Sequence, residues 1–238
     1  MAKKHQLRQL RAGTVINVTS AKQESDIVQA LGRVEIYLNK QYPGVKLRHD
    51  KTWSLADIVD RLRTLFPTVD FYYHFGTSHI RPDGGIFSVV DREGNAFPIL
   101  ISEVKNQGTN DLRQAEGKPR QAKGNAIERL GKNVIGLRAA MRGEAIFPFV
   151  CFGYGCDFEP DSSILDRVST IAMFGKLCKV YLHDSGEHGF FDRGSYFFRS
   201  KQWTVKEMSE VMIEIAEGAL LYYMSKYGRK TIDSDAAR

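Results

Sequence analysis

Two short motifs place charged side chains at the ends of an expected β-hairpin. Asp83 stands in IRPDGG at residues 80–85, and Glu103 and Lys105 stand in ISEVKNQG at residues 101–108. Because strand side chains alternate between faces, Glu103 and Lys105 project from one face, and hairpin pairing can bring Asp83 beside Glu103. Mg²⁺ prefers carboxylate oxygens, and a lysine beside the ion can orient or deprotonate water. The pattern therefore predicts metal-assisted hydrolysis of a phosphodiester.

The same residues have a plainer interpretation as a structural salt bridge at a strand end. Pro-Asp recurs at residues 160–161 and Glu-x-Lys at residues 116–118, so neither string is specific by itself. The first pair differs because an apolar strand leads into Glu103, where a buried charge is costly unless it is paired or used. Spacing and placement alone support the catalytic and the structural interpretation about equally.

A third motif, KGNAIER at residues 123–129, opens a helix expected over about residues 122–141. Asn125 and Arg129 lie four residues apart and share a helix face. Asparagine can bond to adenine, arginine can reach base edges or phosphates, and a helix N-terminus favours phosphate. The alternative is a solvated helix whose Glu128 and Arg129 are surface charges. The carboxylate pair nearby in the sequence favours nucleic-acid recognition.

Helices and strands alternate along the chain around these motifs. Helical spacing is found over residues 25–42, 55–65, 162–174 and 204–227, where Ser54 with Asp57 and Thr204 with Glu207 predict N-terminal caps. Strands are expected over residues 69–75, 84–91, 97–104, 147–155, 179–183 and 195–199. We therefore expect one α/β domain over residues 1–228, with a mixed central sheet flanked by helices. Residues 1–20 are expected to form a flexible basic arm, and residues 229–238 a loose tail.

Charge is distributed unevenly along the 238 residues. The chain has 34 basic and 28 acidic residues, a net charge of +6, and the excess lies in residues 1–51 (net +6) and 103–142 (net +5). Two basic segments favour a polyanion such as nucleic acid as partner, although many soluble proteins are equally basic. A hydrophobic content of 42% excludes wholesale disorder.

Cysteine usage and terminal composition point to a reducing compartment. The three cysteines, Cys151, Cys156 and Cys178, form no C-x-x-C pair and lie near apolar stretches, so we expect buried thiols rather than disulfides or a zinc site. His183 and His188 are expected at the surface. No apolar segment follows the basic N-terminus, and no run approaches the roughly 18 apolar residues of a membrane span. We expect no secretory signal and no membrane partner.

Taken together, the motifs resemble those of the EcoRI-type restriction endonucleases, a branch of the PD-(D/E)-x-K nucleases. The matching runs are RPDGG at 81–85, EVKNQG at 103–108 and GNAIERLGKN at 124–133, in the order and spacing of the family. Weaker similarity extends the resemblance over roughly residues 42–227. It implies a restriction-endonuclease-like fold for the mixed sheet and its helices.

The resemblance assigns a role to each motif. It makes Asp83 and Glu103 ligands of Mg²⁺ and Lys105 the catalytic lysine. It places the helix that opens with G-N-A-x-E-R in the major groove, where Asn125 and Arg129 would read the adenines of an AATT core. Further recognition or supporting positions carried over from the family are Gln107, Ala122, Lys123, Ala126, Glu128, Arg167 and Asp50.

The chain departs from the family pattern where the outer base pair would be read. Arg167 matches an arginine directed at the outer guanine, but Ile164 stands where the family prototype has a second arginine. Gln121 and Lys123 replace a methionine and an alanine, and the segment between Cys156 and Ile164 is shorter. GAATTC is therefore the first expectation for the full site, and its outer base pair stays open.

The resemblance implies a type II restriction endonuclease. Such an enzyme would be a homodimer that cuts double-stranded DNA at a palindrome by direct water attack. A companion DNA methyltransferase, not stably bound, and the cytoplasm of a bacterial-type host are the expected surroundings. Three alternatives stay open: a repair-type, non-specific or RNA-processing nuclease, a DNA-binding protein without activity, and a protein-interaction module.

Overall fold

A mixed five-stranded sheet forms the centre of the chain. The computed structural model describes residues 15–72, 75–106, 117, 125–155, 158, 165, 168, 177–183 and 194–233. The strands β1 (Lys46–Asp50), β4 (Gly85–Val90) and β5 (Ala96–Asn106) pair antiparallel, and β6 (Phe149–Tyr154) and β7 (Ser195–Arg199) continue the sheet in parallel. The observed order β1-β4-β5-β6-β7 confirms the expected α/β fold class, and β5 is its central strand.

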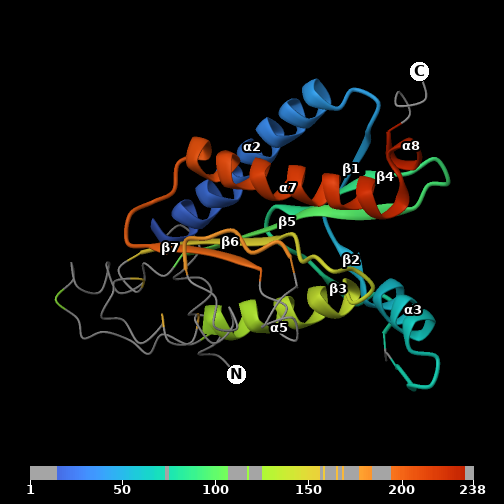
Figure 1. The fold of residues 1–238 in the computed structure, drawn as a ribbon. Coiled ribbons are helices and arrows are strands. Elements are labelled where there is room, and N and C mark those ends of the chain that lie inside the picture. Colours follow the sequence, from blue (N-terminus) through green and yellow to red (C-terminus); the bar gives the residue numbers. More distant parts are fainter. Residues whose placement is uncertain are drawn as a thin grey trace.

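Helices cover both faces of this sheet, as the apolar hairpin predicted. Figure 1 shows α2 (Val15–Gln41) and α7 (Val205–Tyr227) on one face, and α5 (Asn125–Ala140) with α3 (Leu55–Leu65) on the other. Every residue of β4 is buried between these layers. The inner side of α2 shows the helical spacing of three and four that buries one stripe, through Ile27, Ala30, Leu31, Val34 and Leu38.

Capping residues define two of the helix starts. The Ser54 hydroxyl accepts hydrogen bonds from the main-chain N–H groups of Ala56 and Asp57, and α3 begins at the next residue. Thr204 and Glu207 form the reciprocal capping box that the sequence predicted, so α7 begins at Val205. Gly228, with φ of 92°, ends α7 in a conformation that favours glycine.

The predictions for the two ends of the chain differ from the structure. Helix α2 begins at Val15, so residues 15–20 belong to a helix and not to an arm; residues 1–14 lie outside the described part. Residues 229–233 are not loose, because α8 (Arg229–Ile232) buries Ile232, and Asp233 forms a bridge to Val45. Neither segment carries a long apolar repeat, so local periodicity gave no signal for either.

Two predicted strands are absent from the described residues, and three strands were not predicted. Residues 69–72 and 75 form no strand; Tyr72 and Phe75 are exposed, and the short β3 (His79–Ile80) pairs instead with β2 (Trp53–Ser54). Of residues 179–183, His183 makes an isolated bridge to Ile146. Strand β1 was missed because its mostly exposed KLRHD sequence lacks apolar alternation. The helix predicted at 162–174 and the loop at 106–120 lie largely outside the description.

The structure also bears on the expected burial of the cysteines and on the expected lack of a membrane-spanning helix. Cys151 is buried as predicted, whereas Cys178 is exposed in a turn, so the expectation of buried thiols was wrong for Cys178. Cys156 lies outside the described residues. Among the described helices, none is long and apolar enough to cross a membrane.

The cap of α7 should make stability depend on acid pH. Hydrogen bonds from Arg199, at 2.7 and 2.8 Å, and from the Thr204 N–H lower the pKa of Glu207 to about 2. A carboxylate whose pKa is lower in the folded state than in the unfolded state stabilises the fold at pH values above its unfolded-state pKa. This contribution is lost as the pH falls towards 2. Glu207→Gln should therefore unfold more easily than the parent at pH 7, by no more than about 1 kcal/mol because the pair is partly exposed.

Urea unfolding at several pH values between 7 and 3 measures this difference, which should shrink below about pH 4.5. Glu210→Gln is the matched control, because that carboxylate lies one turn further along α7 and 3.8 Å from Lys206 Nζ. A difference for Glu207→Gln that stays constant with pH would contradict the account.

Candidate active site

The antiparallel register of the hairpin brings Asp83 and Glu103 together. Gly85 pairs with Ser102, so the residues just before β4 lie beside the end of β5. The main-chain N–H of Asp83 donates to Glu103 Oε2 at 3.1 Å, and the Val104 N–H donates to Asp83 Oδ2 at 3.2 Å. Each carboxylate is therefore held by the backbone next to the other.

The Lys105 ammonium bridges the two carboxylates. Its Nζ contacts Glu103 Oε1 directly and lies 3.3 Å from Asp83 Oδ2. The exposed fractions of the side chains are 2% for Glu103, 16% for Lys105 and 27% for Asp83, so the group opens to solvent on the Asp83 side. A charge as deeply buried as that of Glu103 is tolerated only when it is paired and hydrogen-bonded.

Burial and charge act together on the proton affinities of the group. Desolvation raises the pKa of Glu103 above its ordinary value; Lys105 opposes this shift and Asp83 adds to it. Desolvation lowers the pKa of Lys105, but attraction to Glu103 and Asp83 outweighs it and leaves the pKa raised. Lys105 is therefore a cation at neutral pH, and its charge offsets the repulsion between the two neighbouring carboxylates.

Two glycines allow the turn that carries Asp83. Gly85 has a φ of 77°, and a Cβ added there would meet the main-chain oxygen of Asp50 at 2.7 Å and His49 Nε2 at 2.5 Å. A Cβ on Gly84 would clash with the Ser102 side chain. The two strands that flank the turn thus leave no room for side chains.

The donor set fits a hard divalent cation. Two converging carboxylates supply anionic oxygens, and Mg²⁺ keeps several waters and needs few protein ligands. Cys151 lies opposite Glu103 on β6, but burial raises the pKa of its thiol well above the ordinary value, so it stays protonated. Asp83 and Glu103 are therefore the residues that could hold the ion.

A hollow of about 180 Å³ opens beside Asp83, and two cationic side chains, Lys51 and Arg81, stand on its rim. His49, Lys51 and Arg81 line it together with Glu24 of α2. Lys51 and Arg81 are exposed, and no ion pair with a carboxylate is seen for either among the described residues. This side of the group is suited to an anion, such as a phosphate of a nucleic-acid backbone.

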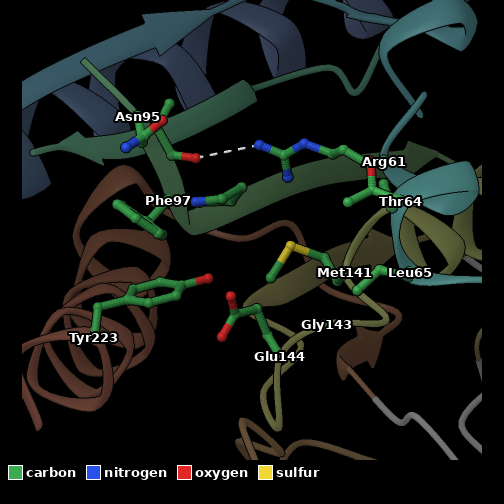
Figure 2. A pocket seen from close by; sticks show the side chains of 12 residues that line it. Arg61, Thr64, Leu65, Asn95, Phe97, Met141, Gly143, Glu144 and Tyr223 are labelled. Atoms are coloured by element: carbon green, nitrogen blue, oxygen red, sulfur yellow. Dashed lines mark hydrogen bonds between the residues drawn. The ribbon is translucent and has the colours of Figure 1, made fainter. Parts of the chain in front are cut away.

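A larger cavity, of about 410 Å³, lies at the other end of β5 and is less suited to this chemistry. Figure 2 shows Glu144 and Tyr223 on one side of it and Arg61 on the other. Its carboxylate, Glu144, already accepts hydrogen bonds from Lys226, Tyr222 and Tyr227. A carboxylate bound this fully is a poor metal ligand, so the hairpin end is the better candidate site.

Comparison with known proteins agrees with the resemblance seen in the motifs. The family described as restriction endonuclease EcoRI matches residues 11–230. The chain belongs to the restriction endonuclease EcoRI family. It is 28% identical to the type II restriction enzyme RsrI of Cereibacter sphaeroides, over 87% of each chain. It is 27% identical to the type II restriction enzyme EcoRI of Escherichia coli, over 77% of this chain and 79% of that protein.

The other positions suggested by the EcoRI family are scattered or undescribed. Asp50 pairs with Arg48 at 2.7 Å and lines a separate hollow with Trp53, so the structure does not bring it into the carboxylate group. The first turns of α5 hold Asn125, Ala126, Glu128 and Arg129, whose side chains are not described. Outside the described residues lie Gln107, Ala122, Lys123 and Arg167.

Sequence reasoning missed His49, which contacts the turn that carries Asp83. His49 Nε2 lies 2.9 Å from the carbonyl oxygen of Gly84. The only signal available was a lone histidine in a polar segment, because the contact depends on the unexpected pairing of β1 with β4.

Replacing Gly85 by alanine should disturb the site more than a comparable change elsewhere. A left-handed φ costs an L-residue about 1–2 kcal/mol, and the contact with the Asp50 backbone adds to this cost. Gly94→Ala is the matched control, since Gly94 has φ of 89° with nothing within 4 Å of its added Cβ. Urea unfolding should show a larger loss for Gly85→Ala, and equal losses would mean that the turn is not tightly enclosed.

Proposed function

We propose that this type II restriction endonuclease makes Mg²⁺-dependent double-strand breaks in DNA at a short palindrome with an AATT core. GAATTC is the first expectation for the full site. The observation that carries the proposal is the group of Asp83, Glu103 and Lys105, in which two carboxylates share one ammonium at the end of a buried strand. Membership of the EcoRI family supports its use in cutting DNA.

The side chains of the group divide the hydrolytic work. Asp83 and Glu103 would hold the ion, which supplies Lewis-acid activation of the phosphodiester when bound. Lys105, a cation in contact with both carboxylates, is placed to orient the attacking water and to donate towards a phosphate oxygen. The basic rim formed by Lys51 and Arg81 would receive the DNA backbone on the open side. Direct attack by water requires no covalent intermediate.

We propose that the first turns of α5 recognise the DNA sequence, as the resemblance to the EcoRI family implies. Figure 1 shows that α5 begins at the end of the sheet where β5 ends, so recognition and cleavage would share one side of the molecule. Asn125 and Arg129 would read the adenines of AATT, and Glu128 would buttress a neighbouring arginine. Close or supporting contacts would come from Gln107, Ala122, Lys123 and Ala126, with Arg167 directed at the outer base pair.

A palindromic site calls for two-fold symmetry in the protein. We propose a homodimer in which each subunit cuts one strand. A companion DNA methyltransferase would protect host DNA without forming a stable complex, and both would act in the cytoplasm. The dimer thus follows from the proposed palindrome, whose two half-sites mirror each other.

Removing the Glu103 carboxylate should abolish cutting while leaving specific binding largely intact. Glu103→Ala should lower the rate of plasmid cleavage by roughly 1,000-fold or more, because the ion loses its buried ligand. Glu103→Gln, which keeps the volume, should behave alike, and Glu93→Gln in the hairpin turn is the control. Cleavage at the parent rate by either Glu103 variant would refute the metal-site assignment.

Replacing Arg129 should weaken discrimination at one base pair. Arg129→Ala should lose about 1–3 kcal/mol of preference for the site over its single-base variants, the amount expected for one bidentate contact. Lys132→Ala, exposed one turn further along α5, should keep the parental preference. Binding competition among duplexes that differ at single positions measures both, and an unchanged preference for Arg129→Ala would remove α5 from recognition.

A further inference from the structure

The main chain next to Asp83 is held from two sides by neighbouring strands. The N–H of Gly84 donates to the Ser102 carbonyl of β5 at 2.9 Å, directly before Glu103. The carbonyl of Gly84 lies 2.9 Å from His49 Nε2 of β1. Because a carbonyl oxygen can only accept, the histidine nitrogen is the donor. Gly84 thus links the strand that carries Glu103 to a histidine two strands away.

His49 is itself held in place. It pairs with Phe87 in the register of β1 and β4, and the two rings meet edge to face with centroids 6.2 Å apart. Phe87 is 2% exposed, so one edge of the imidazole contacts the core, although His49 itself is an exposed residue. The added Cβ of Gly85 would lie 2.5 Å from His49 Nε2, which shows how closely the ring packs on the turn.

We propose that His49 is a positioning residue, which holds the Asp83 carboxylate at its distance from Glu103 by donating to the Gly84 carbonyl. The role rests on the proposed function, since it matters only if Asp83 and Glu103 share an ion. Asp83 is the most exposed member of the group, at 27%, and its carboxylate is tied to the strand by the Val104 N–H. Without His49, Gly84 would keep its hydrogen bond to β5, and the nearest remaining pairing with β1 would be that of Ile86 with Asp50.

The reach of the side chain gives a sharp test of this hydrogen bond. Glutamine places an amide N–H as many bonds from Cβ as His49 Nε2, whereas asparagine places the same group one bond closer to the backbone. His49→Gln should therefore preserve the bond and His49→Asn should lose it. His49→Leu fills similar space without a donor and should behave like His49→Asn.

His79 provides the matched control. Its Nδ1 lies 3.1 Å from the Thr77 carbonyl oxygen, so it makes the same kind of contact on a turn that does not carry the carboxylates. His79→Leu removes this contact as His49→Leu removes the contact to Gly84, and it should leave metal binding and cleavage at the parental level. Any general effect of losing an exposed histidine and its turn contact would appear in this variant as well.

Two measurements on the full chain test the role. The first is Mn²⁺ binding without DNA, counted by electron paramagnetic resonance of the free ion, and the second is the Mg²⁺ concentration for half-maximal single-turnover cleavage. His49→Asn should weaken both by about 10-fold or more, the effect usual for residues that orient metal ligands. His49→Gln should stay within about 3-fold of the parent, and DNA affinity in EDTA should not change in either variant.

The outcomes separate this role from the metal site itself. If Glu103→Ala abolishes Mn²⁺ binding but both His49→Asn and His49→Leu bind the ion as the parent does, the role of His49 is overturned and the metal site stands. Equal losses in His49→Gln and His49→Asn would also overturn it, because the hydrogen bond would then not be the cause. Unchanged Mn²⁺ binding in Glu103→Ala would overturn the metal site and the role of His49 with it.

Discussion

The buried carboxylate of Glu103 constrains the whole arrangement around the hairpin. It lies on the central strand β5, between β4 and β6, with 2% of its side chain exposed. An unpaired carboxylate in that place would cost several kcal/mol, so its surroundings must supply compensation. Lys105, two residues along the same face, and the main-chain N–H of Asp83 supply it.

The fold satisfies this constraint with local pairing on one side and long-range packing on the other. The antiparallel hairpin delivers Asp83, and the parallel strand β6 covers the opposite edge of β5 with Cys151 facing Glu103. The layer of α2 and α7 encloses one face of the sheet. What stays open is the Asp83 side, where Lys51 and Arg81 line a hollow that a phosphate could enter.

Prediction from the sequence worked where the structure depends on neighbours in the chain. The hairpin, the caps at Ser54 and Thr204, and the strand that ends in Glu103 follow from alternation, turn residues and capping, all of which act over a few residues. The closeness of Asp83 to Glu103 was therefore predictable.

Features that depend on distant pairing were not predictable in this way. Strand β1 has a polar sequence and exists because β4 offers it an edge, and His49 reaches Gly84 only through that pairing. The aromatic run at 69–75 has strong β-propensity, yet its described residues form no strand, because propensity yields to the available partners. The early start of α2 and the short α8 likewise lack a local signal.

The proposed cleavage is tested most directly by a map of every cut end that the purified chain makes in a plasmid library of known sequence, with and without Mg²⁺. We expect discrete, Mg²⁺-dependent cuts on both strands at one palindrome containing AATT. The flanking base pair would then define the full site. Absence of cuts, cuts without sequence preference, or equal cutting without a divalent ion would contradict the proposal.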